Sequence, residues 1–294
     1  MKLGVYLPTM MPSGLTGRKA IEWARLADQA GFHVIATLDR PNYDSWDGLA
    51  TLAGMATITK RVRLSTMTLQ LPTRNEVVVA KQAAVIDQLS GGRFELGVSL
   101  GGRRDDYDAL GAQWEDRARR FRRQVATIRE TWSGARDSTE ELGVLGPAPV
   151  QQPGPPVWIG AYAPSAVGRA IELADGYFFG GDKFPPEIAA DIQRVREQAR
   201  QLDKERFVVG SMLYVAVGEE NAARGEMWRQ LGRYYRENLG GEPKDWGVYG
   251  PAETIAEVLR GYADAGLDFL IIAPQINDLA QLEVIAESIL PAYL

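Results

Sequence analysis

One pattern limits what this chain can fold into: short runs of β-branched and apolar residues alternate with longer amphipathic runs along its whole length. Such alternation is typical of parallel strands joined by crossover helices, because each helix packs on the sheet between two strands. Eight strands are expected, at residues 3–7, 32–38, 62–69, 94–98, 157–160, 177–180, 207–217 and 269–273. Helices are expected between them, at residues 18–29, 46–59, 77–89, 114–132, 165–174, 186–202, 219–238, 253–265 and 279–290.

Two parallel architectures produce this alternation, an open doubly wound sheet and a closed barrel. The dinucleotide-binding form of the open sheet places a GxGxxG motif after its first strand, and this chain has none there. Eight strands in 294 residues match the usual size of a closed barrel. We therefore expect an α/β fold of the (β/α)8 TIM barrel type, with loop insertions, as one domain over residues 1–294.

Two segments interrupt the alternation. Residues 133–156 contain five prolines, too many ring-locked residues for a helix or a central strand, so a surface loop is expected there. Residues 240–250 are interpreted as irregular, and both a lid and a passive connector remain open for this stretch.

Composition excludes several functional classes. The chain has no Cys and one His, which removes thiolate catalysis, iron–sulfur clusters and Cys-ligated zinc. Its net charge of −5 lacks the excess of basic residues that is typical of nucleic-acid-binding proteins, so a small-molecule partner is expected instead. The start of the chain lacks the features of a signal peptide, and no run approaches the roughly 18 apolar residues of a membrane span. A cytoplasmic protein is expected, with no membrane partner.

Candidate site residues follow the expected strands, because active sites of such barrels lie at the carboxyl ends of their strands. Asp39 and Arg40 follow the second strand, and they are the candidate catalytic residues. Ser99 and Gly101 stand in a glycine-rich run after the fourth strand, where the backbone can approach a ligand closely.

The expected strand ends contain few residues of the types that bind metal ions. His33 precedes the second strand, so it is expected at the opposite, structural end of the barrel. Asp105 and Asp106 are interpreted as caps of a short helix, since carboxylates bind the free N–H groups of a helix start. No metal site is expected.

Two glycine-rich junctions between a strand and a helix are candidates for binding a phosphate. Ala161, Tyr162 and Ala163 lie in the first junction, and Gly180 and Gly181 lie in the second. Small residues let the backbone approach an anion, and a helix start offers unpaired N–H groups. Tight-turn geometry alone explains the same residues, so both interpretations stay open at this point.

Several segments form a recognisable series along nearly the whole chain: Gly31-Phe32, Asp39 at the end of the second strand, Arg63 to Thr66, the run Leu89 to Val98 (LSGGRFELGV), and Pro156 to Gly160. In this order they resemble the bacterial-luciferase-like flavin-dependent monooxygenase and oxidoreductase family. Each is weak alone, because Ser-Gly-Gly-Arg can simply stop a helix before a strand. Their common order makes the resemblance specific.

The resemblance implies a (β/α)8 barrel, often a homodimer, with a flavin or deazaflavin lying across the strand ends. It places the cofactor ring against the third strand, where Met67-Thr68 matches a family bulge that commonly carries a cis peptide bond. It places the phosphate on the junctions at Ala161–Ala163 and Gly180–Gly181, in agreement with the anion site suggested by the residues themselves.

At one position the chain departs from the family pattern. Many members carry His directly after the Asp that ends the second strand, and this chain has Arg40 there. An arginine does not exchange a proton near neutrality, but it can stabilise developing negative charge. A mechanism that relies on a proton-donating imidazole is therefore in doubt.

The implied function is that of a reduced-FMN-dependent monooxygenase acting on a small organic substrate. A separate flavin reductase is the implied partner, because the chain has no nicotinamide-binding fingerprint. The alternatives are hydride transfer with the deazaflavin coenzyme F-420, which needs a deazaflavin reductase instead, and a non-catalytic flavin-binding protein.

Overall fold

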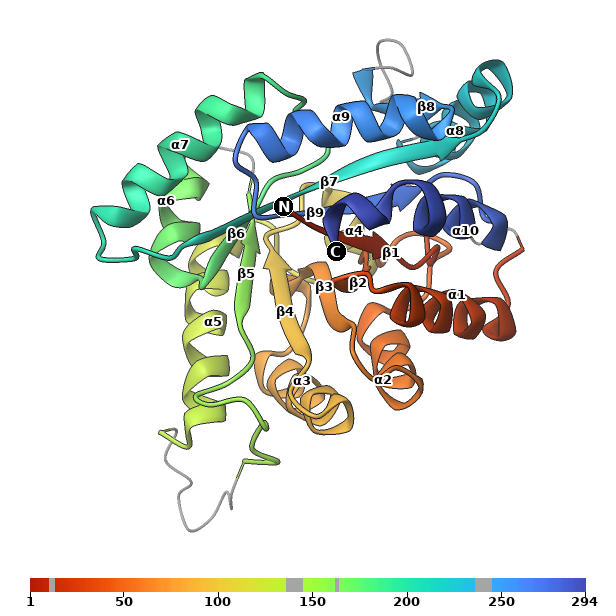
Figure 1. The fold of residues 1–294 in the computed structure, drawn as a ribbon. Coiled ribbons are helices and arrows are strands. Elements are labelled where there is room, and N and C mark those ends of the chain that lie inside the picture. The colour runs from red at the N-terminus through yellow and green to blue at the C-terminus, as the bar shows by residue number, and fades with distance from the viewer. Residues whose placement is uncertain (11–13, 136–144, 162–163, 236–244) are drawn as a thin grey trace.

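The computed structural model describes residues 1–10, 14–135, 145–161, 164–235 and 245–294. Eight of its parallel strands form a closed ring in the order β1-β2-β3-β4-β5-β6-β7-β9, because β6 pairs with β7 and β9 returns to β1. The expected barrel is thus confirmed (Figure 1). The strands are β1 Lys2–Tyr6, β2 Val34–Thr37, β3 Arg63–Gln70, β4 Phe94–Ser99, β5 Val157–Gly160, β6 Gly176–Phe178, β7 Val208–Val217, β8 Gly247–Gly250 and β9 Phe269–Pro274.

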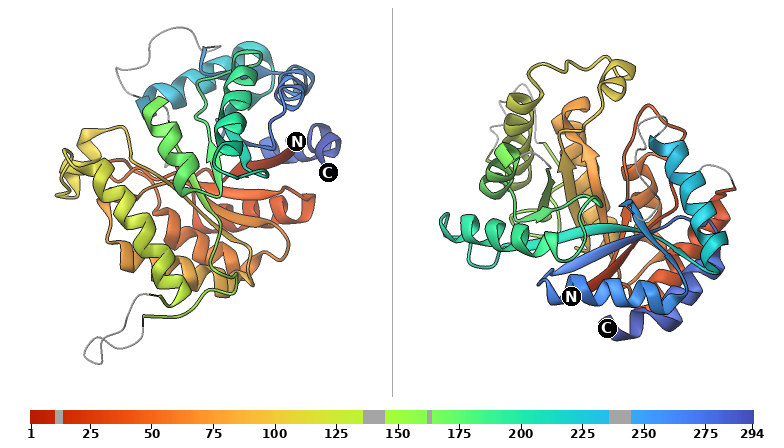
Figure 2. Two further views of the ribbon diagram at one scale, coloured as in Figure 1. Left: turned by 90° about the vertical axis from the view of Figure 1, so that its left-hand side faces the viewer. Right: turned by 90° about the horizontal axis from the view of Figure 1, so that it is seen from above.

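Helices cover the outside of this ring in both views of Figure 2. Thr16, Asp47 and Asn75 cap three of them through side-chain oxygens that accept backbone N–H groups, and Gly31 and Gly91 end two in the left-handed conformation. The helices are α1 Gly17–Ala30, α2 Gly48–Ile58, α3 Glu76–Ser90, α4 Arg104–Ala109, α5 Arg117–Ser133, α6 Pro164–Leu173, α7 Glu187–Arg200, α8 Glu220–Tyr235, α9 Ala252–Asp264 and α10 Leu279–Ser288, with 3-10 turns η1 Leu71–Thr73 and η4 Leu290–Tyr293.

Alternate residues of each strand point into the barrel or outward against the helices. The inward set includes Tyr6, Met67, Trp158 and Phe269, which pack together inside the ring. The outward set, for example Leu64, belongs to the larger core between the strands and the helices. Side chains therefore fill the barrel, and space for a ligand is left at its mouth.

The amino-terminal end of the barrel is closed by a buried ion pair. Glu95 accepts hydrogen bonds from Arg63 and from the indole of Trp158, and burial raises the pKa of its carboxyl. His33 lies at this end, as expected, directly before β2. Burial, with the nearby cations of Lys2 and Arg63, lowers its pKa from 6.5 to about 4.

One segment differs from expectation. Residues 240–250 were expected to be irregular, but Gly247–Gly250 forms strand β8, which pairs in parallel with the Tyr214–Val217 half of β7. The rest of that stretch, apart from residues 245 and 246, lies outside the described residues. Among the described residues, no helix is both long and apolar enough to cross a bilayer.

Candidate active site

A cavity of about 580 Å³ opens at the carboxyl ends of the barrel strands, a size typical of small-molecule sites. Because all the ring strands are parallel, their carboxyl ends share this face. Eight of the expected site residues line this cavity. They are the two catalytic candidates, Asp39 and Arg40, and six candidates for cofactor binding: Met67, Thr68, Ser99, Gly101, Ala161 and Gly180. The cavity is also lined by residues that were not predicted to belong to the site, chiefly Gln70, Asp106, Arg169, Tyr234 and Tyr235.

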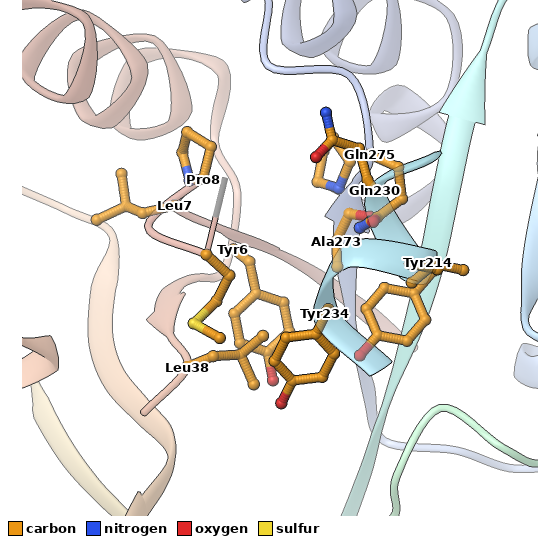
Figure 3. A pocket seen from close by; sticks show the side chains of 12 residues that line it. Tyr6, Leu7, Pro8, Leu38, Tyr214, Gln230, Tyr234, Ala273 and Gln275 are labelled. Carbon is orange, nitrogen blue, oxygen red and sulfur yellow. The ribbon is translucent and has the colours of Figure 1, made fainter. Parts of the chain in front are cut away.

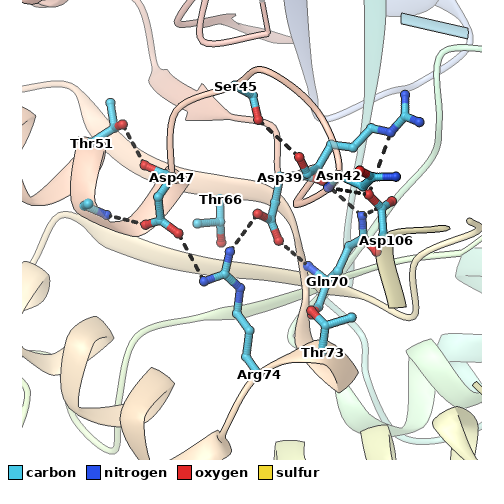
Figure 4. A network of polar contacts seen from close by, with 12 residues as sticks. Asp39, Asn42, Ser45, Asp47, Thr51, Thr66, Gln70, Thr73, Arg74 and Asp106 are labelled. Atoms are coloured by element: carbon cyan, nitrogen blue, oxygen red, sulfur yellow. Dashed lines mark hydrogen bonds and ion pairs between the residues drawn. The ribbon is translucent and has the colours of Figure 1, made fainter. Parts of the chain in front are cut away.

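Asp39 is held rigidly at the end of β2. One carboxylate oxygen accepts a hydrogen bond from Arg74 at 2.8 Å and the other accepts the backbone N–H of Gln70 at 2.9 Å (Figure 4). Burial raises the pKa of this carboxyl, while Arg74 and the Gln70 N–H oppose the rise. Since both oxygens are engaged, Asp39 is suited to positioning the end of β3 rather than to touching a ligand.

Arg40 is buried, at 2% exposure, although it lines the cavity. Its guanidinium donates to the backbone carbonyl of Tyr234 at 2.6 Å and to Asp105 at 3.4 Å. It also lies over the rings of Tyr43 and Tyr234, at 5.3 and 5.1 Å from their centroids. Arg40 therefore joins the β2 loop to the end of α8 across the barrel mouth.

Asp106 does not act as the helix cap that its position suggested. It is fully buried, and its carboxylate accepts the backbone N–H of Asn42 and the side-chain amide of Gln70, both at 2.9 Å. The Arg40 Nε atom lies 3.9 Å from it. The physical reason for the difference is that α4 turns this carboxylate inward, where it accepts hydrogen bonds from the loop after β2 and from the end of β3 (Figure 4).

The Met67–Thr68 peptide bond is cis, as predicted, and the pairing of β3 with β4 shifts register between Thr66 and Leu69. The hydroxyl of Tyr6 donates to the carbonyl of Met67 at 2.6 Å from inside the barrel. On the cavity side, the hydroxyls of Thr68 and Ser99 are joined by a hydrogen bond of 2.8 Å. This bulge therefore presents a hydroxyl pair to the cavity.

The two glycine-rich junctions follow β5 and β6 at the same rim. Ala161 and Gly180 line the cavity, whereas Gly181 is not among its lining residues and packs beside Met212. Tyr162 and Ala163, predicted for the same junction, lie outside the described residues. The prediction missed Arg169 of α6, which adds a positive charge to this side of the cavity.

Helix α8 supplies the opposite wall through Tyr234 and Tyr235, whose rings meet edge to face with centroids 4.7 Å apart. Tyr234 also lines a smaller cavity of about 40 Å³, together with Tyr6, Tyr214 and Gln275 (Figure 3). The sequence carries a weak signal for this wall, a Tyr-Tyr pair at the end of an amphipathic run. Its position over the mouth depends on the tertiary packing of α8.

The cavity is lined by hydroxyls, the amide of Gln70, three arginines and two carboxylates, those of Asp39 and Asp106. Among the residues that the structure describes, no three His, Cys, Asp or Glu side chains could hold a metal ion together. Both acidic groups of the lining, Asp39 and Asp106, already accept hydrogen bonds. The site can bind and shield a planar, anionic molecule, but its reactivity must come from a cofactor.

Comparison with known proteins identifies the family of this chain. The family described as luciferase-like monooxygenase matches residues 1–242. The oxygenase component of a flavin-dependent trigonelline monooxygenase from Acinetobacter baylyi is 26% identical over 216 residues, which cover 69% of this chain and 60% of that protein. The match thus spans less than two thirds of that relative's length.

Two solved structures share the fold over the whole chain. Monooxygenase RslO1 from Streptomyces bottropensis has a TM-score of 0.82 at 20% identity, with 100% of both chains covered. A coenzyme F420 dependent tetrahydromethanopterin reductase from Methanopyrus kandleri has a TM-score of 0.77 at 16% identity, covering 100% of this chain and 99% of the other. Proteins of this fold therefore include both oxygenases and deazaflavin-dependent reductases.

Proposed function

The chain belongs to the luciferase-like monooxygenase family, and from this premise we propose that it is a reduced-FMN-dependent monooxygenase acting on a small organic substrate. The observation that carries the proposal is the cavity at the barrel mouth, which joins a hydroxyl pair, two glycine-rich junctions and three arginines. The similarity to the trigonelline monooxygenase supports oxygen transfer rather than hydride transfer.

The residues of the cavity fit a flat cofactor ring. Gly101 has a φ of 74°, and a Cβ atom there would collide with the side-chain oxygen of Gln70. A Cβ on Gly160 would lie 3.0 Å from the Cγ2 atom of Thr68, so this glycine keeps the space over the β3 bulge open. We propose that the ring binds beside Met67 and Thr68.

The phosphate of the cofactor has a matching place on the β5 and β6 side. We propose that it binds at Ala161–Ala163 and Gly180–Gly181, with Arg169 supplying the counter-charge, because backbone N–H groups and a guanidinium together suit a phosphate.

When bound in its reduced form, FMN supplies the electrons that activate molecular oxygen for transfer of one oxygen atom to the substrate. The chain's own residues position the bound molecules and shield them from water. Tyr234 and Tyr235 close one side of the cavity against water, and Arg40 offers a fixed positive charge that stabilises negative charge developing beside it. Asp39 acts indirectly, by holding the end of β3 through the backbone of Gln70.

Hydride transfer with coenzyme F-420 is the second candidate function. It is favoured by Arg169 of the cavity, because a guanidinium beside the glycine-rich junctions also suits a cofactor with a longer anionic tail. The two functions differ in their need for oxygen.

An oxygen electrode separates the two functions. Protein supplied with chemically reduced FMN and a panel of small ketones, aldehydes and aromatic acids should consume oxygen and form a product that carries one atom of ¹⁸O from ¹⁸O₂. Product formation with F-420 under strict anaerobiosis, and none with FMN, would support hydride transfer instead. A flavin reductase from any source should replace the chemical reductant, since we propose that the natural reductant is a separate reductase.

We further propose that the protein is a homodimer that pairs through α2 and α3, which pack beside each other. Val78, Val85 and Leu89 of α3 are 51%, 41% and 48% exposed. The exposed positions of these two helices, both fully described, include a single charged residue, Lys81. A face with several exposed apolar side chains and one charge can pair with its own copy about a twofold axis.

A further inference from the structure

Arg103 stands out among the cations of the barrel mouth. It follows β4, lines the cavity, and places its guanidinium over the rings of Tyr234 and Tyr235, at 5.3 and 5.4 Å from their centroids. Two aromatic contacts of this kind hold the guanidinium in one place at the α8 wall.

The charge of Arg103 has no acidic partner among the described residues. Nearby carboxylates are engaged elsewhere: Asp105 pairs with Arg40, and Asp108 pairs with Arg104. The two tyrosines under Arg103 do not neutralise it, because burial raises the pKa of both, to about 12 for Tyr234. A cation that faces a cavity without a counter-charge attracts an anionic ligand.

The chemistry of this position selects the type of anion. A guanidinium offers two parallel N–H donors in its own plane, the geometry that a carboxylate matches. The aromatic wall beside it, formed by Tyr214, Tyr234 and Tyr235, suits a planar ring. The group bound here differs from the cofactor phosphate proposed above, since that cradle follows β5 and β6 and has its own arginine, Arg169.

We propose that Arg103 binds the carboxylate of a planar aromatic substrate and so selects aromatic acids for the cavity. That the bound acid is a substrate rests on the proposed function. Its binding to Arg103 does not require the cofactor.

Binding is tested by isothermal titration calorimetry with three planar carboxylates, benzoate, nicotinate and 2-naphthoate, and with neutral benzamide. At least one carboxylate should bind the wild-type protein saturably and more tightly than benzamide. Arg103→Gln should weaken carboxylate binding by about tenfold to a hundredfold, because a charge-assisted pair is lost, and should leave benzamide unaffected. Arg104→Gln is the matched control, since Arg104 is exposed and pairs with Glu115, and it should change nothing.

Other outcomes would overturn the proposal. They are absence of saturable carboxylate binding to wild type, equal binding of carboxylate and benzamide, or equal losses in the two variants. Thermal unfolding of Arg103→Gln and Arg103→Lys checks that both are folded. The lysine variant should recover part of the affinity, since it keeps the charge but loses the planar edge.

A parallel titration with FMN and F-420 separates this proposal from the preceding one. Arg103→Gln should bind both cofactors as wild type does, within about twofold. A loss of cofactor affinity that matches the loss for carboxylates would assign the anion to the cofactor and refute substrate recognition by Arg103. Failure of wild type to bind either cofactor, with carboxylate binding intact, would refute the proposed function alone.

Discussion

Removing the charge of Arg40 should destabilise the barrel mouth strongly, because the guanidinium is buried beside a fully buried carboxylate. Arg40 Nε lies 3.9 Å from Asp106, a separation worth about 4 kcal/mol of attraction at an effective dielectric constant of about 20. The hydrogen bond to the Tyr234 carbonyl would also be lost. Desolvation already reduces the net value of the intact pair, but Arg40→Met leaves Asp106 buried without its cation, a change that costs about 3–5 kcal/mol.

A double-mutant cycle by urea unfolding measures this coupling. Asp106→Asn keeps an oxygen for the N–H of Asn42, and after this change Arg40 retains Asp105 but loses its buried carboxylate neighbour. The combined variant Arg40→Met with Asp106→Asn should therefore lose less stability than the sum of the single variants, by about 1–3 kcal/mol. Arg104→Met, an exposed control, should cost about 0–1 kcal/mol. Additive losses, or a loss below about 1 kcal/mol for Arg40→Met, would refute this reasoning.

Three further predictions concern separate features. Gly101→Ala should weaken FMN binding in a fluorescence titration far more than Gly111→Ala does, because both glycines have positive φ but only the first would place a Cβ against Gln70; equal effects would contradict the cavity fit. The pKa of His33 is about 4 in the folded protein and 6.5 for an exposed imidazole, so between these values the unfolded state binds a proton that the folded state excludes. Stability should therefore fall as the pH drops from about 6.5 to 4. His33→Gln should reduce this fall, as measured by urea unfolding midpoints across that range. Val85→Glu should convert a dimer to a monomer in sedimentation equilibrium, and a wild-type monomer at all concentrations would exclude the proposed pairing.

Much of the barrel could be predicted because its information is local. The alternation of apolar runs and amphipathic runs marks each strand and helix, and glycines such as Gly31 and Gly91 mark where helices end. Strand β8 was missed for a physical reason. Its sequence, Gly-Val-Tyr-Gly, has two glycines in four residues, and it is extended because the free half of β7 offers it hydrogen-bond partners.

The site could be predicted only where chemistry follows a strand end directly. Asp39, Arg40 and Ser99 were singled out in this way and line the cavity, and the resemblance to the family added Thr68 and the position of the cis bond. Asp106 could not be recognised, since a carboxylate in the first turn of a helix is usually a cap.

Tyr234 and Tyr235 were missed for a related reason. They follow no strand, and they reach the mouth because α8 packs beside β7 and β8. Arg169 likewise lies inside α6, several residues along the sequence from the nearest strand end. Long-range packing decides such positions, and sequence periodicity does not report it.

The proposed function requires that FMN binds in the cavity with its phosphate near Arg169. Fluorescence titration of the cofactor-free protein with FMN and with F-420 measures this binding. We expect saturable binding of one FMN per chain, tighter than that of F-420, and weakened by about tenfold in Arg169→Gln through loss of one charge-assisted contact. Arg122→Gln, which changes an exposed arginine that pairs with Glu172, should bind as wild type does. Tighter binding of F-420 than of FMN, or saturation by neither, would contradict the proposed function.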